Sequence, residues 1–180
     1  DDRRILFASN FLGMEEAKKT GDRSAARRFS LFLVDENGEN LERVTFSDEF
    51  DSFPMFSPDG SFLVYNSRIS GNQKLFRLDL GTKKKTQLTF GTNDESAAQF
   101  FDDHTLLFSS TATNPNQPLD PDVAKNANIY NAWTLDLKTG ELKQYTDTLG
   151  GILSPVVLND PAGAKIGFVS YYKGEYELHA

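Results

Sequence analysis

The sequence predicts an all-β protein: a β-propeller built from four-stranded antiparallel blades, with only part of the ring present in this chain. Two observations lead to this prediction. The stretch from Phe53 to Thr89 holds four short runs of strand-forming residues separated by turn residues, and the rest of the chain repeats the pattern. A four-stranded unit of about 40 residues has the size of one propeller blade.

The four runs of this central stretch are predicted as strands because they are rich in aromatic and β-branched residues. Between the first two runs, Ser57-Pro58-Asp59-Gly60 predicts a tight turn, in which Pro58 fixes φ and Gly60 accepts a positive φ. Further turn residues separate the later runs. The predicted strands are Phe53–Phe56, Phe62–Asn66, Lys74–Leu80 and Thr86–Phe90.

The pattern recurs along the chain, and the same residue type marks the end of the corresponding strand in each unit. An aspartate ends the third strand and a threonine ends the fourth strand of each unit that reaches them, and a serine ends the second strand. These residues are Asp35, Asp79 and Asp136; Thr45, Thr89 and Thr146; and Ser9, Ser67, Ser110 and Ser170. We therefore expect four blade units, at 1–50, 51–96, 97–151 and, incomplete, 152–180.

The other units are predicted in the same way, with strands at Arg4–Ser9, Phe29–Asp35 and Leu41–Phe46 in the first. The third has a first strand ahead of a turn at Phe100–His104, then Leu106–Ser110, Ile129–Leu137 and Leu142–Thr146, after a polar connector at 91–96. The fourth has Ser154–Leu158, Lys165–Ser170 and Glu175–Ala180. With 14 strands, this is about three and a half blades, whereas closed propellers have about four to eight.

These motifs resemble the TolB-like family of WD-like propeller repeats, which also occurs in the propeller domains of tricorn and prolyl-oligopeptidase-like peptidases. The resemblance rests on the turn Pro54 to Gly60, on Tyr65 and Ser67, on Asp79-Leu80, and on Gln87-Leu88-Thr89. The later unit repeats it with Asp136-Leu137, Thr139-Gly140, Gln144 and Thr146. The resemblance implies a bacterial periplasmic, or otherwise exported, protein-binding module.

Composition excludes several classes of function. The 180 residues carry a net charge of −7, which argues against a nucleic-acid surface, since such surfaces need clustered cations. No apolar run approaches the roughly 20 residues of a membrane-spanning helix. The chain opens on a predicted strand without a signal-peptide pattern, so we expect processed or excised material. Cysteine is absent, which excludes disulfides and thiolate metal sites.

Two units carry a long insertion at the same joint, between their second and third strands. The first, Asn10 to Arg28, is expected to be a solvated loop with one helical turn at most. The second, Thr111 to Asn128, contains three prolines and is expected to be irregular. In a four-stranded meander, both project from the same face. The predicted partner-binding residues are Phe11, Arg23, Arg27, Arg28, Asn114, Asn116, Asp120 and Asp122.

The second insertion also offers oxygen ligands at Asp120, Asp122, Asn126 and Asn128. A calcium site and a set of Asx-type turns both fit these residues, and the spacing does not follow the EF-hand order, so no metal is predicted. No cofactor is predicted either, because no glycine-rich phosphate loop occurs.

No catalytic residues are predicted. His104 lies in a predicted turn and His179 near the last predicted strand, and there is no G-x-S-x-G elbow for a serine nucleophile. The recurrent aspartates are typical of structural hydrogen bonding at strand ends. The run Lys83 to Lys85 is typical of a solvated hairpin turn. Trp133 and Phe76 occupy matching third strands and are expected to be buried between adjacent blades.

The leading hypothesis is thus a non-catalytic, exported scaffold that binds a protein or peptide partner with the insertion face. The alternative is the propeller domain of a larger hydrolase, a peptidase or amidohydrolase, which gates or docks substrate. An enzyme with its site in the central channel is disfavoured by the scarcity of histidine. Further blades, or a second chain, are expected to close the ring.

Overall fold

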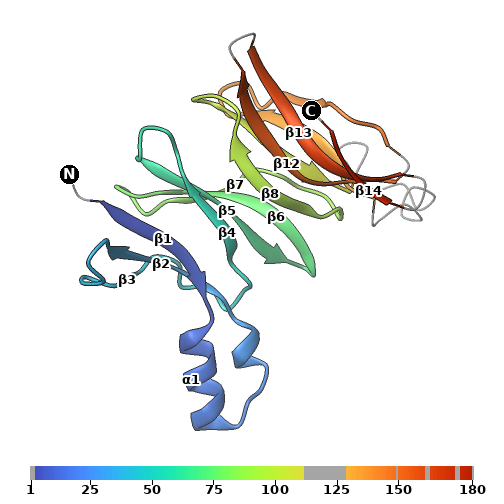
Figure 1. Ribbon diagram of the computed structural model, residues 1–180. Coiled ribbons are helices and arrows are strands. Elements are labelled where there is room, and N and C mark those ends of the chain that lie inside the picture. Colours follow the sequence, from blue (N-terminus) through green and yellow to red (C-terminus); the bar gives the residue numbers. More distant parts are fainter. Residues whose placement is uncertain (1–2, 112–128, 149, 161–162, 173–174, 180) are drawn as a thin grey trace.

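In the computed structural model the chain forms four antiparallel sheets that are arranged side by side as an open fan (Figure 1). The structure describes residues 3–111, 129–148, 150–160, 163–172 and 175–179. The sheet of the first unit lies at one end of the fan and the sheet of the fourth unit at the other (Figure 1). This arrangement is part of a β-propeller ring, and it confirms the predicted fold class.

Every sheet is a meander, because each strand pairs with its neighbour along the chain. The first sheet has β1 (Arg4–Ser9), β2 (Ser30–Asp35) and β3 (Glu42–Arg43), and the second has β4 (Ser52–Phe56), β5 (Phe62–Ile69), β6 (Asn72–Asp79) and β7 (Lys85–Gln87). The third has β8 (Glu95–Phe100), β9 (Thr105–Ser110), β10 (Asn131–Asp136) and β11 (Leu142–Gln144), and the fourth has β12 (Ile152–Asp160), β13 (Gly163–Tyr172) and β14 (Glu175–His179).

Helix occurs only between β1 and β2 in the described part of the chain, as α1 (Phe11–Thr20) and the short 3₁₀ helix η1 (Ala25–Arg27). Within these described residues, helix is therefore absent outside the first insertion. No helix among the described residues has both the length and the apolar character that crossing a membrane requires.

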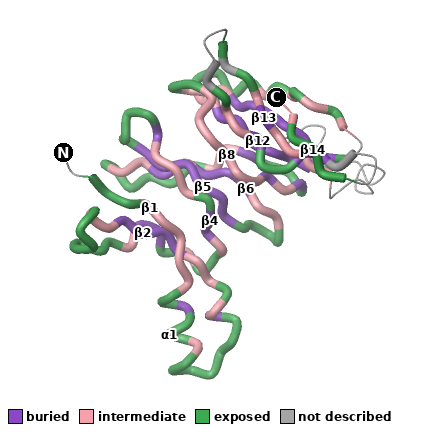
Figure 2. Tube along the Cα trace, in the orientation of Figure 1, coloured by how far each residue is buried: buried purple, intermediate pink, exposed green. Residues whose placement is uncertain are grey.

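The side chains of the middle strands alternate between two interfaces, so the first half of β5, Phe62 to Tyr65, reads as an unbroken apolar run. Leu63 and Tyr65 join a cluster with the first sheet, whereas Phe62 and Val64 join a cluster with the third sheet. A smaller cluster around Leu107 lies between the third and fourth sheets. Figure 2 shows the buried segments running along the middle of the sheets.

Phe76 and Trp133 lie in two of these interfaces, as predicted. Phe76 is 3% exposed in the cluster between the first and second sheets, and Trp133 is 5% exposed in the cluster between the second and third. Each residue therefore contributes to holding one sheet against the next.

The predicted turn at Ser57 to Gly60 is also confirmed. The N–H of Gly60 donates to the carbonyl of Ser57 at 2.8 Å, and Gly60 has a φ of 70°. The Ser57 hydroxyl donates to Asp59 Oδ1 at 2.6 Å, and this bond is the largest of those that lower the pKa of Asp59 to about 2. The motif therefore fixes the turn through both its backbone and its side chains.

The recurrent threonines make the same hydrogen bond in three sheets. Each threonine hydroxyl accepts the N–H of a residue in the third strand, at 3.0, 3.0 and 2.8 Å. The pairs are Leu31 with Thr45, Leu75 with Thr89, and Ala132 with Thr146. Because the hydroxyl replaces a backbone carbonyl in the ladder, the fourth strands end earlier than predicted, at Arg43, Gln87 and Gln144.

The aspartates at the ends of the third strands also act structurally. Asp79 Oδ1 accepts the N–H and the hydroxyl of Thr82, and Asp136 Oδ1 accepts the N–H groups of Lys138 and Thr139. Hydrogen bonds to the carboxylate lower the pKa of both aspartates, and the N–H of residue 82 or 139 is the largest cause in each case.

One boundary differs from the prediction. The segment 91–96 was expected to be a polar connector, but Glu95 and Ser96 already belong to β8. Glu95 pairs with Ser110 across the two strands and is fully buried. The polar residue at this position therefore belongs to a buried hydrogen-bond network and does not mark a solvated loop.

We predict that Trp133→Ala lowers the free energy of unfolding by about 3–5 kcal/mol, because the truncation leaves a cavity between two sheets. Chemical denaturation followed by circular dichroism measures this change. A loss below about 1 kcal/mol would show that the indole contributes little to the interface.

We also predict that Thr45→Val costs about 1–3 kcal/mol, since it leaves the buried N–H of Leu31 without its acceptor. Thr86→Val is the matched control, because Thr86 is exposed and no hydrogen bond of its hydroxyl is found among the described residues. Equal stabilities for the two variants in the same denaturation assay would contradict a structural role for the recurrent threonine.

Candidate functional site

The first insertion forms a compact helical hairpin that projects from the end of the first sheet (Figure 1). It was expected to be a solvated loop with one helical turn at most, and this expectation is wrong. Gly13 is buried, and a Cβ built there would lie 2.1 Å from the carbonyl oxygen of Ala25. The absence of a side chain at Gly13 therefore lets α1 pack directly on η1.

Two further interactions fix this hairpin. Gly21 ends α1 in the left-handed conformation, with φ at 76° and its N–H donating to the carbonyl of Ala17. Arg28 Nη1 donates to both carboxylate oxygens of Glu16 at 3.2 Å and lies 3.7 Å from Asp48. The hairpin is thus tied both to itself and to the segment that leads into the second sheet.

The predicted binding residues of this insertion have different environments. Phe11 is 38% exposed, and its ring packs against Phe32 at 4.8 Å between centroids. Arg28 is half-buried and engaged in the ion pairs just described. Arg23 and Arg27 are exposed and form no ion pair with any described residue. The charges available to a partner are therefore those of Arg23 and Arg27.

Sequence reasoning missed two apolar neighbours of Phe11. Leu12 and Met14, in the first turn of α1, are 39% and 42% exposed. Together, Phe11, Leu12 and Met14 form what we name the helix patch. Exposed apolar side chains on the first turn of a rigid helix offer contact surface to a partner. The sequence does contain a signal for this patch, because three large apolar residues lie close together in an otherwise charged insertion.

The remaining predicted binding residues, Asn114, Asn116, Asp120 and Asp122, lie outside the described residues. The same holds for Asn126 and Asn128 of the possible calcium site. Whether the two insertions share a face is therefore still a prediction. Within the part that the structure describes, no three acidic or histidine side chains are grouped as metal ligands.

The first strands of the second, third and fourth sheets contact one another in succession, as the innermost strands of a propeller do. Each contains a β-bulge and a residue with positive φ that is not glycine. These residues are Phe53, Ala97 and Ser154, with φ of 48°, 51° and 46°. The shared bulge marks the inner strands as a repeated structural device of the ring.

Neither described histidine forms a catalytic triad. His104 lies between Asp102 (Nδ1 to Oδ1, 3.2 Å) and Asp136 (Nε2 to Oδ2, 3.6 Å), and so joins the two turns of its sheet. His179 Nε2 lies 3.3 Å from the Ser170 hydroxyl and 3.8 Å from Glu177. Because the same nitrogen faces both groups, Glu177 does not orient the ring through Nδ1, as a triad requires.

Two deeply buried charges link the second and third sheets. Lys74 on β6 is 2% exposed and Glu95 on β8 is fully buried, with Nζ at 3.0 Å from Oε2. Lys74 also donates to the carbonyls of Phe90 and Asn93. Glu95 accepts from Thr89, Asn93 and Ser110. Every partner comes from these two sheets or the segment between them, which indicates a structural network.

Burial raises the pKa of Glu95 to about 7, although Lys74 opposes this shift. A carboxyl whose pKa is raised on folding binds its proton more tightly in the native state, so its contribution to stability falls as pH rises. This fall begins near the unfolded pKa, about 4.5, and is complete above about 7.

We predict that the free energy of unfolding of the wild type, relative to Glu95→Gln, falls between pH 5 and 7 by up to about 1.4 kcal/mol per pH unit. Denaturant titrations at several pH values measure the difference. Taking the difference removes the contributions of the titratable groups that both proteins share. A difference that is constant or rises with pH would show that Glu95 is ionised across this range.

Comparisons with known proteins agree with the fold. No family model matches the chain. The Tol-Pal system protein TolB of Ruegeria sp. is 30% identical over 95 residues, which are 53% of this chain and 19% of that protein. A TolB homologue of Chlorobium luteolum is 42% identical over 52 residues, 29% of this chain and 12% of that protein. The chain thus spans a fifth or less of these relatives.

Solved structures show the same architecture. TolB from Acinetobacter baumannii superposes on 84% of this chain with 34% of its own, at a TM-score of 0.58 and 19% identity. An oligogalacturonate lyase from Vibrio parahaemolyticus covers 93% of this chain with 43% of its own, at 0.57 and 16% identity. A puromycin hydrolase covers 83% with 22% of its own, at 0.57 and 15% identity.

The structural likenesses establish the fold, which proteins with several activities share. The sequence relatives cover a narrower range of proteins than the structural ones, since both are TolB proteins. The repeat motifs, the fold and the sequence relatives agree in showing similarity to TolB-type β-propellers, over part of the chain and a fifth or less of those relatives.

Proposed function

We propose that the chain is the protein-binding propeller segment of an exported, periplasmic bacterial scaffold, and that it has no catalytic role of its own. The observation that carries this proposal is the helix patch, Phe11, Leu12 and Met14, three exposed apolar residues at the start of α1. The hairpin that holds α1 projects from the end of the first sheet (Figure 2). Methionine, aromatic residues and arginine are enriched at protein interfaces, and all three occur here.

The hairpin suits a binding role because its geometry is fixed before binding. Gly13, Gly21 and Arg28 hold α1 in place, so little conformational entropy is lost when a partner docks. Arg23 and Arg27 add positive charge beside the apolar residues. The partner surface that fits this arrangement has an apolar pocket with an acidic rim.

The relatives' names supply a first candidate partner, since they are proteins of the Tol-Pal system. We propose Pal of the same bacterium as the probe. We further propose that additional blades, from the same polypeptide or a second chain, complete the ring, since a closed propeller has about four to eight blades.

The binding test compares the wild type with Leu12→Ser/Met14→Ser/Arg23→Glu/Arg27→Glu. These residues are exposed, so the fold should persist while the affinity for purified Pal falls at least about tenfold, equivalent to 1.4 kcal/mol. Isothermal titration calorimetry measures the affinity, and circular dichroism checks the fold. Leu41→Ser is the matched control, because Leu41 is an exposed apolar residue next to the β2–β3 hairpin turn.

Affinity that is unchanged in the fourfold variant would move the binding surface away from the helix patch. The alternative, a propeller that docks substrate for a larger hydrolase, makes a different prediction. It requires a peptidase or amidohydrolase domain in the same open reading frame, and finding one would overturn the scaffold proposal.

A further inference from the structure

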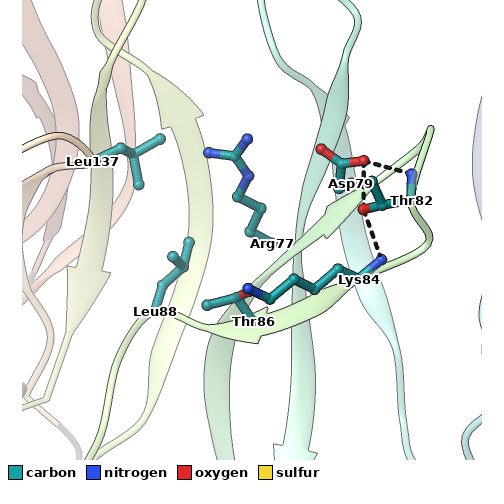
Figure 3. Close-up of a pocket in the computed structure, with 7 residues that line it drawn as sticks. All are labelled: Arg77, Asp79, Thr82, Lys84, Thr86, Leu88 and Leu137. Atoms are coloured by element: carbon teal, nitrogen blue, oxygen red, sulfur yellow. Dashed lines mark hydrogen bonds between the residues drawn. The ribbon is translucent and has the colours of Figure 1, made fainter.

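A groove of about 290 Å³ lies between the second and third sheets, near the β6–β7 hairpin turn (Figure 3). Arg77 and Lys84 are the cations that line it, and Leu88 and Leu137 supply apolar surface from the two sheets. In the first sheet, α1 lies in the connection between β1 and β2. The corresponding connection in the second sheet is that between β5 and β6, and the β6–β7 hairpin turn lies at the opposite end of β6. The groove is therefore separate from the helix patch.

Arg77 is half-buried on β6, and its guanidinium lies over the ring of Phe62 at 3.7 Å. Such stacking holds the planar group in one orientation and leaves its N–H groups free to donate at the edge. Arg77 forms no ion pair with any residue that the structure describes. Arg77 interacts electrostatically with Asp79, but no described carboxylate is directly paired with it. A half-buried arginine in this position has lost part of its hydration, and a bound carboxylate would compensate for that loss.

Lys84 is the one lysine of its run that is turned to this groove. Lys83 Nζ pairs with Glu42 of the first sheet at 3.3 Å, and Lys85 Nζ lies 4.3 Å from the ring centre of Phe76. Figure 3 shows Lys84 extending from the hairpin along Thr86. In the described part of the chain Lys84 has no acidic partner, so two cations face the groove without ion pairs.

Asp79 is the carboxylate of the groove lining, and it is engaged elsewhere. Its Oδ1 accepts the Thr82 N–H at 2.7 Å and the Thr82 hydroxyl at 2.8 Å (Figure 3). It forms no ion pair with Arg77 or Lys84 within 4 Å. The lining therefore keeps a net positive charge, on a chain whose overall charge is −7.

The repeat itself shows that these cations are not required by the fold. At the position of Arg77, two residues before the strand-end aspartate, the first and third sheets have Leu33 and Thr134, both buried. In each hairpin, the backbone N–H of the strand-end aspartate donates to a backbone carbonyl across the turn. This carbonyl belongs to Lys84 in the second sheet, but to Glu39 in the first and Glu141 in the third. Among these three sheets, both positions carry a cation only in the second, whose β6–β7 hairpin lines the groove.

We propose that this groove binds an acidic segment of a partner polypeptide, with one carboxylate held between Arg77 and Lys84. The flat edge of Arg77 matches the two oxygens of a carboxylate, and Lys84 adds a mobile charge at the open side. Leu88 and Leu137 contact an apolar side chain next to the acidic residue. The net charge of −7 on the whole chain makes most other surfaces less favourable for such a segment.

The probe is a fluorescein-labelled peptide that repeats Glu-Leu-Glu, and the control peptide repeats Gln-Leu-Gln. Fluorescence anisotropy at low salt measures the dissociation constant for the whole chain. The internal repeat supplies the variants, Arg77→Leu and Lys84→Glu, which install residues that sister sheets carry at these positions. Each should raise the dissociation constant of the Glu peptide by about tenfold or more.

Two controls make the test specific. Lys83→Glu changes the charge of the same hairpin by the same amount, but on the side that faces the first sheet, so it should have a smaller effect than Lys84→Glu. Arg77→Lys keeps the charge but loses the planar guanidinium that stacks on Phe62. Its affinity should therefore lie between those of the wild type and Arg77→Leu. Thermal melts followed by circular dichroism confirm that each variant is folded.

Equal affinity for the Glu and Gln peptides would overturn the proposal, and so would equal losses for Lys83→Glu and Lys84→Glu. Failure of the Glu peptide to bind at millimolar concentration would also overturn it. None of these outcomes bears on the helix patch, because the variants leave α1 and η1 unchanged.

Discussion

Apolar packing between neighbouring sheets is the constraint on which the rest of the structure depends. A four-stranded sheet with two apolar faces is stable only when each face is covered, and the clusters around Phe76, Trp133 and Leu107 provide this cover. Because each sheet supplies side chains to two interfaces, apolar residues on its middle strands point to both faces. The loops at the ends of the sheets are then free to vary, and the candidate binding residues lie there.

Polar groups inside the interfaces contribute in a different way. The Lys74–Glu95 pair is buried between the second and third sheets, where desolvation offsets much of its electrostatic attraction. Its hydrogen bonds to Thr89, Ser110 and backbone carbonyls require one relative placement of the two sheets. We infer that this network contributes more to the register between sheets than to the free energy of unfolding, which the apolar clusters dominate.

The fold could be predicted from the sequence because the repeated motifs act locally. The turn at Ser57–Gly60, the strand-end Asp79 and Thr89 each fix hydrogen bonds within a few residues or one strand pair. The helical hairpin could not be predicted, because it depends on contacts distant in sequence: Gly13 on Ala25, and Arg28 on Glu16 and Asp48. Burial of Glu95 was missed for the same reason, since its partners come from two sheets.

The candidate site was only partly predictable, and the repeat explains why. Motif matching emphasises what the units share, which is the residues that build the sheets. A binding residue is expected where one unit departs from the others at a position that the fold leaves free. Arg77 is such a departure, since Leu33 and Thr134 fill the same place without charge. The insertion with Leu12 and Met14 is another. In a repeat protein, comparing units position by position in the structure therefore separates residues retained for folding from residues available for binding.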